Sequence, residues 1–204
     1  AVLIPAVCDT LKCFGQKWKG TCPAIPFVHP QNRRDDHSVA FLTSEYQMIR
    51  KKLEEILQVE ITDQKISESI ILYNEYRSVM REFTGLAADY PLTITPTVRH
   101  KIIKAGYFME KAEYIAIMKQ INSGLRLRKP ESSEDRKVVV TGLTLEPDGL
   151  LEIFEQFHLQ ICADDLAQES RQFRTDVPWF GTPVESLAET LGVMISFWVM
   201  RVLF

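Results

Sequence analysis

The stretch KVVVTGLTLEPDGLLEIFEQFHLQICADD, residues 137–165, decides the fold class. KVVVTG is a short, β-branched run ending at Gly142, which is typical of a buried strand. EPDGLLEIFEQFH has the spacing of an amphipathic helix, and LQICADD is a second buried strand that ends at Asp164 and Asp165. Strand, helix and strand at this spacing predict a βαβ unit with parallel strands. On the helix we expect these residues to face inward: Leu150, Ile153, Phe154 and Phe157.

A second unit of the same kind opens the chain. AVLIPAV (1–7) is predicted to be a strand, TLKCFGQKWKG (10–20) a helix and AIPFVHP (24–30) another strand. Ligands of open parallel sheets bind at the carboxyl ends of the strands. The strand ends to examine are therefore those at Cys8, Thr141 and Asp164.

Between the two units the chain is helical. Apolar residues recur at helical spacing through TSEYQMIRKKLEEIL (43–57) and in two later segments, and RLRKPESSEDRK has the composition of a linker. We predict an α/β fold in which Rossmann-like βαβ units with parallel sheets flank a helical block, incomplete at both ends. We expect the second part of a first Rossmann-like domain at 1–42 and the helical block at 43–125. A linker at 126–136 then leads to the start of a second Rossmann-like domain, with an apolar tail, at 137–204.

Composition excludes some classes of function. The 204 residues are 46% hydrophobic with a net charge of -3, which gives no reason to expect nucleic acid as a partner. No apolar span reaches the roughly 20 residues of a membrane helix, so we expect no membrane partner. Four cysteines are few for a disulfide scaffold, which favours reduced thiols and a cytoplasmic protein. We expect three of them to be small, buried apolar residues: Cys13, Cys22 and Cys162.

The residues alone leave the chemistry open. Cys8 at a strand end suits a thiolate ligand or a nucleophile, but its spacing from Cys13 and Cys22 matches no common zinc pattern. DDLAQESRQFRTDVP (164–178) is either a solvated, locally ion-paired face or a pocket wall or a contact between subunits. The candidate contact residues are Asp9, Asp165, Glu169, Ser170 and Arg171. No histidine has a context that marks it as a ligand: His29, His37, His100 and His158.

Five segments together resemble one family, the 2-hydroxyacyl-CoA dehydratases. They are CDTLKCFGQKWKG, PFVHPQNRR, ITDQKISESIILYNEYRSVMREF, RHKIIKAGYFMEKAEY and ADDLAQESRQFRTDVP. The family includes 2-hydroxyglutaryl-CoA dehydratase and is related to benzoyl-CoA reductase. The chain is most similar to the beta-type subunit of the heterodimeric enzyme, and the resemblance runs to about Leu187.

This resemblance implies an enzyme of amino-acid-fermenting anaerobes that converts an (R)-2-hydroxyacyl-CoA into the enoyl-CoA through a ketyl radical. It implies an alpha-type partner subunit, an ATP-dependent iron–sulfur activator protein and an acyl-CoA substrate. It also implies a 4Fe-4S cluster held by three cysteines with one iron open to substrate. FMN, which some members bind, is a candidate cofactor of the parent enzyme.

Of the family's cluster ligands, the resemblance carries over only one. Cys8-Asp9 matches the CD dipeptide of the middle cluster cysteine, so Cys8 is the expected metal and cofactor ligand. The other two cluster segments have no counterpart here, and VMISFWVMRVLF (193–204) departs from the family in a way typical of a frameshift or truncated gene. We therefore expect an internal piece of a longer subunit that is inactive alone. The alternatives are an inactive remnant or structural partner subunit, and a reductase of the benzoyl-CoA type.

Overall fold

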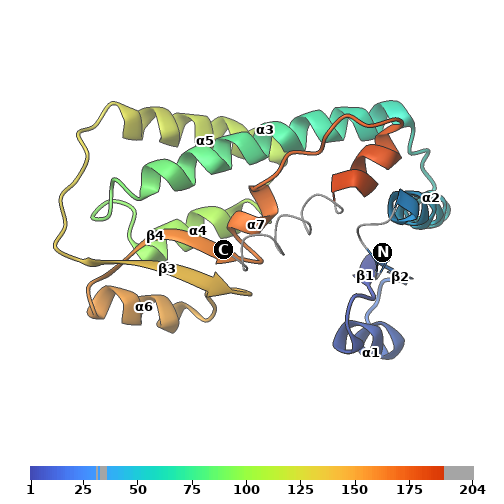
Figure 1. Cartoon of the computed structure of the whole chain (residues 1–204), viewed down its shortest axis with the longest axis horizontal. Coiled ribbons are helices and arrows are strands. Elements are labelled where there is room, and N and C mark those ends of the chain that lie inside the picture. Colours follow the sequence, from blue (N-terminus) through green and yellow to red (C-terminus); the bar gives the residue numbers. More distant parts are fainter. Residues whose placement is uncertain (31, 33–35, 191–204) are drawn as a thin grey trace. The chain divides into compact units, whose positions relative to one another are not determined.

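The computed structural model describes residues 1–30, 32 and 36–190, which form two compact units (Figure 1). Of the described residues, the first unit comprises those in 1–70 and 177–190, and the second comprises Ile71–Asp176. Each unit contains a two-stranded parallel sheet. The predicted α/β class with parallel strands is thus confirmed, and each unit has an apolar cluster of its own.

The first unit begins with the predicted strand, helix and strand. β1 (Val2–Pro5) pairs in parallel with β2 (Ala24–Phe27), and α1 (Asp9–Lys17) connects them. Next comes α2 (Asp36–Leu57). Prolines occur in both strands, at positions 5 and 26, and each strand has one free edge among the described residues, where a missing backbone N–H is tolerated.

The two faces of this small sheet bury different residues. Ile4 is buried beside Gly15 of α1. Ile25 and Phe27 lie on the opposite face of the sheet and form a cluster with Ile49 of α2. Because alternate strand residues point to opposite faces, α1 and α2 cover the two sides of the β1–β2 pair.

The second unit is built around three helices. α3 (Asp63–Ala87) enters it from the first unit, and α4 (Pro96–Ala105) and α5 (Lys111–Arg126) follow. Asn122 of α5 donates to the Val79 carbonyl of α3 at 3.0 Å, so these two helices lie side by side. The apolar centre of the unit contains Met80, Phe83, Ile103, Tyr114 and Met118.

The second βαβ unit follows the linker. β3 (Arg136–Gly142) pairs in parallel with β4 (Leu159–Leu166), and α6 (Asp148–Gln156) packs against β4, as Figure 1 shows. α7 (Ser170–Phe173) follows β4. The apolar cluster beneath the strands consists of Leu145, Leu151, Ile161 and Leu166.

The predicted inward face of α6 is partly wrong. Leu151 is fully buried, whereas Ile153 and Phe157 are exposed. Ile153 lies two residues, or about 200°, around the helix from Leu151, and Phe157 follows the last helical residue. Leu150 and Phe154 do pack against the apolar cluster, as expected.

A bulge in β4 sets the direction of the acidic residues at its end. Val138 pairs with Ile161 but Val139 pairs with Ala163, so Cys162 is the extra residue. The thiol of Cys162 donates to the Val138 carbonyl at 3.3 Å. The inserted residue puts Asp164, rather than Ala163, on the face of Ile161, because strand side chains alternate.

Within the described part of the chain, no helix is long and apolar enough to cross a membrane. The expectation for the tail, residues 193–204, lies outside the described residues.

Candidate functional site

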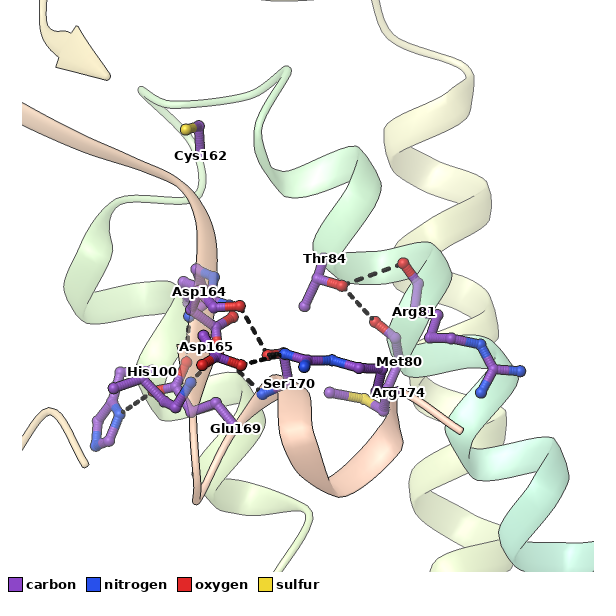
Figure 2. Close-up of polar contacts among 12 residues, drawn as sticks. Met80, Arg81, Thr84, His100, Cys162, Asp164, Asp165, Glu169, Ser170 and Arg174 are labelled. Atoms are coloured by element: carbon purple, nitrogen blue, oxygen red, sulfur yellow. Dashed lines mark hydrogen bonds and ion pairs between the residues drawn. The ribbon is translucent and has the colours of Figure 1, made fainter. Parts of the chain in front are cut away.

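The densest polar cluster of the second unit lies at the carboxyl ends of β3 and β4. Figure 2 shows Asp164, Asp165, Glu169 and Ser170 gathered where β4 runs into α7, with His100 on one side and Arg174 on the other. In parallel sheets this end of the strands is where ligands bind. The predicted strand ends at Thr141 and Asp164 are both found here, in the last residues of β3 and β4.

The helix α4 supplies cations to this cluster. Thr95 caps its start by accepting a hydrogen bond from the backbone N–H of Val98, and Pro96 occupies its first position. The buried side of the helix carries Pro96, Arg99, His100 and Ile103. This i, i+3, i+4, i+7 spacing is one helix face, so two basic side chains take positions that an amphipathic helix usually gives to apolar residues.

Arg99 is only 3% exposed and forms ion pairs with both Asp164 and Glu169. The second oxygen of Asp164 accepts hydrogen bonds from the backbone N–H groups of Leu166 and Ser170, each at 3.0 Å. These contacts fix the turn between β4 and α7. A buried charge must be paired in this way, because an isolated one would be strongly disfavoured in the protein interior.

His100 lies between two carboxylates. Its Nδ1 is 2.9 Å from Glu169 Oε1, and its Nε2 is 3.2 Å from Glu146 Oε1. The two ring nitrogens donate at the same time only in the imidazolium form, because a neutral imidazole has one donor and one acceptor. Glu146 also pairs with Lys104, and hydrogen bonds from Lys104 and then His100 lower the pKa of the Glu146 carboxyl.

Asp165, the neighbour of Asp164, has its own basic partners. Arg171 contacts it through Nε at 3.2 Å and a terminal nitrogen at 2.7 Å, and Arg174 contacts it at 2.6 Å. The hydrogen bonds from Arg171 are the main cause that lowers the pKa of Asp165 from 3.8 to about 2. This part of the segment forms a local, partly exposed ion-pair network.

A cavity of about 400 Å³ opens beside this cluster. His100, Ile103 and Lys104 line it from α4, and Tyr107 and Phe108 line it from the following turn. Its remaining lining consists of Glu146, Gln168, Glu169 and Gln172. The volume falls in the range of small-molecule sites, which are mostly apolar with a few placed polar groups.

The turn after α4 is held in place by the helical core. The amine of Lys111 binds the Gly106 carbonyl, and the Tyr114 ring packs so closely that a Cβ at Gly106 would be 3.1 Å from it. Tyr107 donates to the Gln168 carbonyl at 2.6 Å. Burial, and then the charge of Glu169, raise the pKa of Tyr107, so its hydroxyl stays protonated at neutral pH.

In the first unit, Cys8 follows the carboxyl end of β1. It is exposed, occupies the N-cap of α1 in extended conformation, and its side chain makes no capping hydrogen bond. Asp9 is exposed and contacts Lys12 at 3.6 Å. Cys13 lies on α1 and is exposed, so the expectation that it is buried is wrong, while Cys22 and Cys162 are partly buried.

The described residues contain no group of three or more histidine, cysteine or acidic side chains placed to hold a metal ion. A 4Fe-4S cluster takes three or four cysteine ligands. Cys8 has the exposure and the donor atom that such a ligand needs. The described part of the chain, however, does not complete a ligand set around it.

Sequence reasoning named one part of the polar cluster and missed another. Of the predicted contact residues, Glu169 lines the cavity, Ser170 binds Asp164, and Asp165 and Arg171 pair with each other. The missed residues are Arg99, His100, Lys104 and Glu146. Helical periodicity offered a signal, because it puts Arg99 and His100 on the same face as Ile103.

Comparison with known proteins identifies relatives for nearly the whole chain. Residues 1–200 match the family model described as "2-hydroxyglutaryl-CoA dehydratase, D-component". The similarity therefore extends further than Leu187, where the sequence analysis expected it to end. The chain is 48% identical over 87% of its length to lactoyl-CoA dehydratase subunit beta of Anaerotignum propionicum, covering 47% of that protein. It is 39% identical over 92% of its length to the (R)-phenyllactyl-CoA dehydratase beta subunit of Clostridium sporogenes, covering 51%.

A third relative is (R)-2-hydroxyglutaryl-CoA dehydratase, subunit beta, of Acidaminococcus fermentans, at 35% identity over 87% of this chain and 48% of the relative. The chain thus spans about half the length of the curated relatives that it matches.

Proposed function

The chain belongs to the family of the 2-hydroxyglutaryl-CoA dehydratase D-component, and we propose that it acts as part of a beta-type subunit of a 2-hydroxyacyl-CoA dehydratase. The reaction removes the 2-hydroxyl group and a β-proton from a 2-hydroxyacyl-CoA as water and leaves the enoyl-CoA. The observation that carries this proposal is the similarity over 87–92% of the chain to beta subunits named for three such dehydratases.

The proposal includes an alpha-type partner subunit and an ATP-dependent iron–sulfur activator protein. The activator supplies one electron, which converts the thioester to a ketyl radical and lowers the barrier to loss of the hydroxyl group. A protein of the relatives' length has about twice the residues of this chain, so the remaining cluster ligands and the acyl-group pocket have room outside it.

We place Cys8 as one ligand of a 4Fe-4S cluster. An exposed thiol at the carboxyl end of a parallel strand lies where ligands of such sheets bind. The described residues do not complete the ligands of the cluster, so no reaction step is assigned to it.

The test is activity of the complete enzyme. A full-length subunit with this sequence, combined anaerobically with partner and activator, should dehydrate at least one of three substrates: (R)-lactoyl-CoA, (R)-phenyllactyl-CoA or (R)-2-hydroxyglutaryl-CoA. Cys8→Ala should lower both iron content and turnover, whereas Cys13→Ala, at a second exposed thiol on α1, should leave both unchanged. Full iron and turnover in the Cys8→Ala enzyme would rule out this ligand assignment.

The chain of 204 residues alone should bind no stoichiometric cluster and should dehydrate nothing. Three thiolates are needed and only Cys8 is assigned. Anaerobic reconstitution with iron and sulfide, followed by iron counting and absorbance, tests this expectation. A stable cluster on the short chain would mean that Cys13, Cys22 or Cys162 is recruited.

The alternative of a benzoyl-CoA-type reductase rests on a more distant relative, a subunit of benzoyl-CoA reductase of Thauera aromatica, at 26% identity. Reduction of benzoyl-CoA by the assembled enzyme, without dehydration of 2-hydroxyacyl-CoA, would favour it. Loss of both activities in a correctly assembled complex would instead favour an inactive structural subunit.

A further inference from the structure

His100 is a buried titratable side chain that joins three segments of the second unit. It lies on α4 and is 5% exposed. Its Nδ1 contacts Glu169, in the turn after β4, and its Nε2 contacts Glu146, in the segment between β3 and α6. Figure 2 shows the ring beside Glu169. A single imidazole thus links α4 to the segments that follow both strands.

The two contacts of the His100 ring require a proton. A neutral imidazole has one N–H donor and one acceptor nitrogen, and an ionised carboxylate can only accept. With a neutral ring and two ionised glutamates, a nitrogen lone pair would face a carboxylate oxygen at one of the two contacts. Both contacts are hydrogen bonds only when His100, Glu146 and Glu169 together hold one further proton, as in the imidazolium form.

The charges around His100 also balance only with this proton. The neighbouring charged and titratable groups are Arg99 and Lys104 of α4, Tyr107 of the following turn, Glu146 after β3, and Asp164 and Glu169 at the end of β4. Tyr107 is neutral, so two positive charges face three negative ones. One proton removes the remaining negative charge, and burial favours such a balanced cluster because an unpaired charge is costly in the interior.

The two glutamates differ in how firmly they are held. The side chain of Glu169 is 2% exposed and pairs with Arg99, whereas that of Glu146 is 35% exposed and pairs with Lys104. When the ring loses a proton, one N–H remains, and we expect it to stay on Nδ1, which faces the buried and closer carboxylate. Nε2 then no longer donates to Glu146. Because His100 and Glu146 both line the cavity, this change alters its wall.

We propose that His100, Glu146 and Glu169 bind one exchangeable proton, and that its loss releases Glu146 from the ring and presents Nε2 to the cavity as a hydrogen-bond acceptor. With the proton bound, the ring ties the segment after β3 to α4. Without it, the ring keeps only its bond to Glu169. This pH-sensitive switch concerns the protons of the chain itself and does not depend on dehydratase activity or on a cluster.

The experiment follows the His100 ring by NMR in the ¹⁵N-labelled 204-residue chain between about pH 5 and 9, the range that brackets histidine titration. Long-range ¹H–¹⁵N spectra report the protonation of each ring nitrogen, and His100→Gln identifies the signals. We expect both nitrogens to be protonated at the acidic end and only Nδ1 at the basic end. The backbone amide signals of Leu145 and Glu146 should shift with the same midpoint, and His100→Gln should abolish that shift.

A charge-removing variant tests the link to Glu146. Glu146→Gln should move the midpoint of the His100 signals to lower pH, because it removes a negative charge that favours the imidazolium form. Glu155→Gln is the matched control and should move it much less. Glu155 lies on α6, which also packs against α4, but it accepts from the Thr97 backbone N–H instead of contacting His100. Circular dichroism checks that each variant is folded.

Three results would overturn the proposal. The first is a His100 ring that keeps one protonation state over the whole pH range, because no proton is then exchanged. The second is a neutral ring with its proton on Nε2, which would leave Glu146 bound and Glu169 released. The third is an equal shift of the midpoint in the Glu146→Gln and Glu155→Gln proteins.

Discussion

The carboxyl ends of the two small parallel sheets differ in the burial and pairing of their polar side chains. At the end of β4, Asp164 and Glu169 are buried against Arg99, and backbone N–H groups of the same turn bind Asp164 as well. At the end of β1, Cys8 is exposed and its side chain makes no capping bond. The same strand–helix connection thus supports a self-contained ionic cluster in one place and an open thiol in the other.

This difference between the two strand ends indicates which of them contributes to stability and which is available for binding. A buried ionic cluster holds its own backbone in one geometry, and its energetics depend on every member being present. An exposed thiol contributes little to folding and is available for a bond from outside the unit. Mutations at the two ends should therefore separate stability from binding.

The largest expected effect is that of Arg99→Ala. Removing this guanidinium leaves the Asp164 and Glu169 carboxylates buried without their shared partner, which should lower the free energy of unfolding by about 3–5 kcal/mol. Urea denaturation followed by circular dichroism measures it. Arg171→Ala is the control in the partly exposed ion pair of the same turn and should cost about 1 kcal/mol or less. Equal costs for the two variants would contradict the contrast between buried and exposed pairs.

A smaller loss is expected for Gly142→Ala at the end of β3. The φ of Gly142 is 146°, a conformation that other residues rarely adopt, so the variant should lose about 1–3 kcal/mol through backbone strain. Gly124→Ala, in α5, is the matched control: its Cβ would meet nothing within 4 Å, and alanine should stabilise that helix by about 0.5–1 kcal/mol. Thermal unfolding of both proteins should shift the melting temperature in opposite directions.

The ion pairs of Asp165 should appear in the pH dependence of stability. Its pKa is lowered to about 2 in the folded protein, so its contribution is present above about pH 4 and is lost as the pH falls towards 2. Because the side chain is about one-third exposed, we expect about 1 kcal/mol at neutral pH. Asp165→Asn should be less stable than the native chain at about pH 6 by this amount and equally stable near pH 2. A gap that stays constant between these pH values would contradict the assignment.

The smallest effect on folding should come from Cys8→Ala. The thiol is exposed and caps no backbone N–H, so the unfolding free energy should change by less than about 0.5 kcal/mol. The urea midpoint of the isolated chain measures this. A loss above about 1 kcal/mol would mean that Cys8 has a structural role and would weaken its interpretation as a ligand held for a cofactor.

The sequence predicted the elements of both units well, for a local reason. Two patterns are properties of short segments: β-branched runs bounded by turn residues, and apolar residues repeated about every 3.6 positions. These patterns correctly predicted the positions of β1, α1, β2, β3, α6 and β4. Parallel pairing followed from the length of each strand–helix–strand segment, since a helix-length connection returns the chain in the same direction. The family was also identifiable from the order of five segments along the chain.

Other features were decided only by tertiary structure. The inward face of α6 depends on what lies beneath it, and helix spacing alone did not distinguish Leu151 from Ile153. The bulge at Cys162 shifts the alternation of β4 by one residue, and no local pattern marks it. That shift puts Asp164, rather than Asp165, on the face of Ile161, where it reaches Arg99, and Asp165 reaches Arg171 instead.

The sequence by itself therefore determined the α/β class, the parallel strands, the family and the position of Cys8 after a strand. Tertiary structure decided that Arg99 and His100 of α4 meet Asp164 and Glu169, about 70 residues away along the chain. The physical reason is that a buried charge specifies only that a partner of opposite charge must be near. Which residue supplies it is fixed by helix packing and strand register, and these are properties of the folded unit rather than of any single segment.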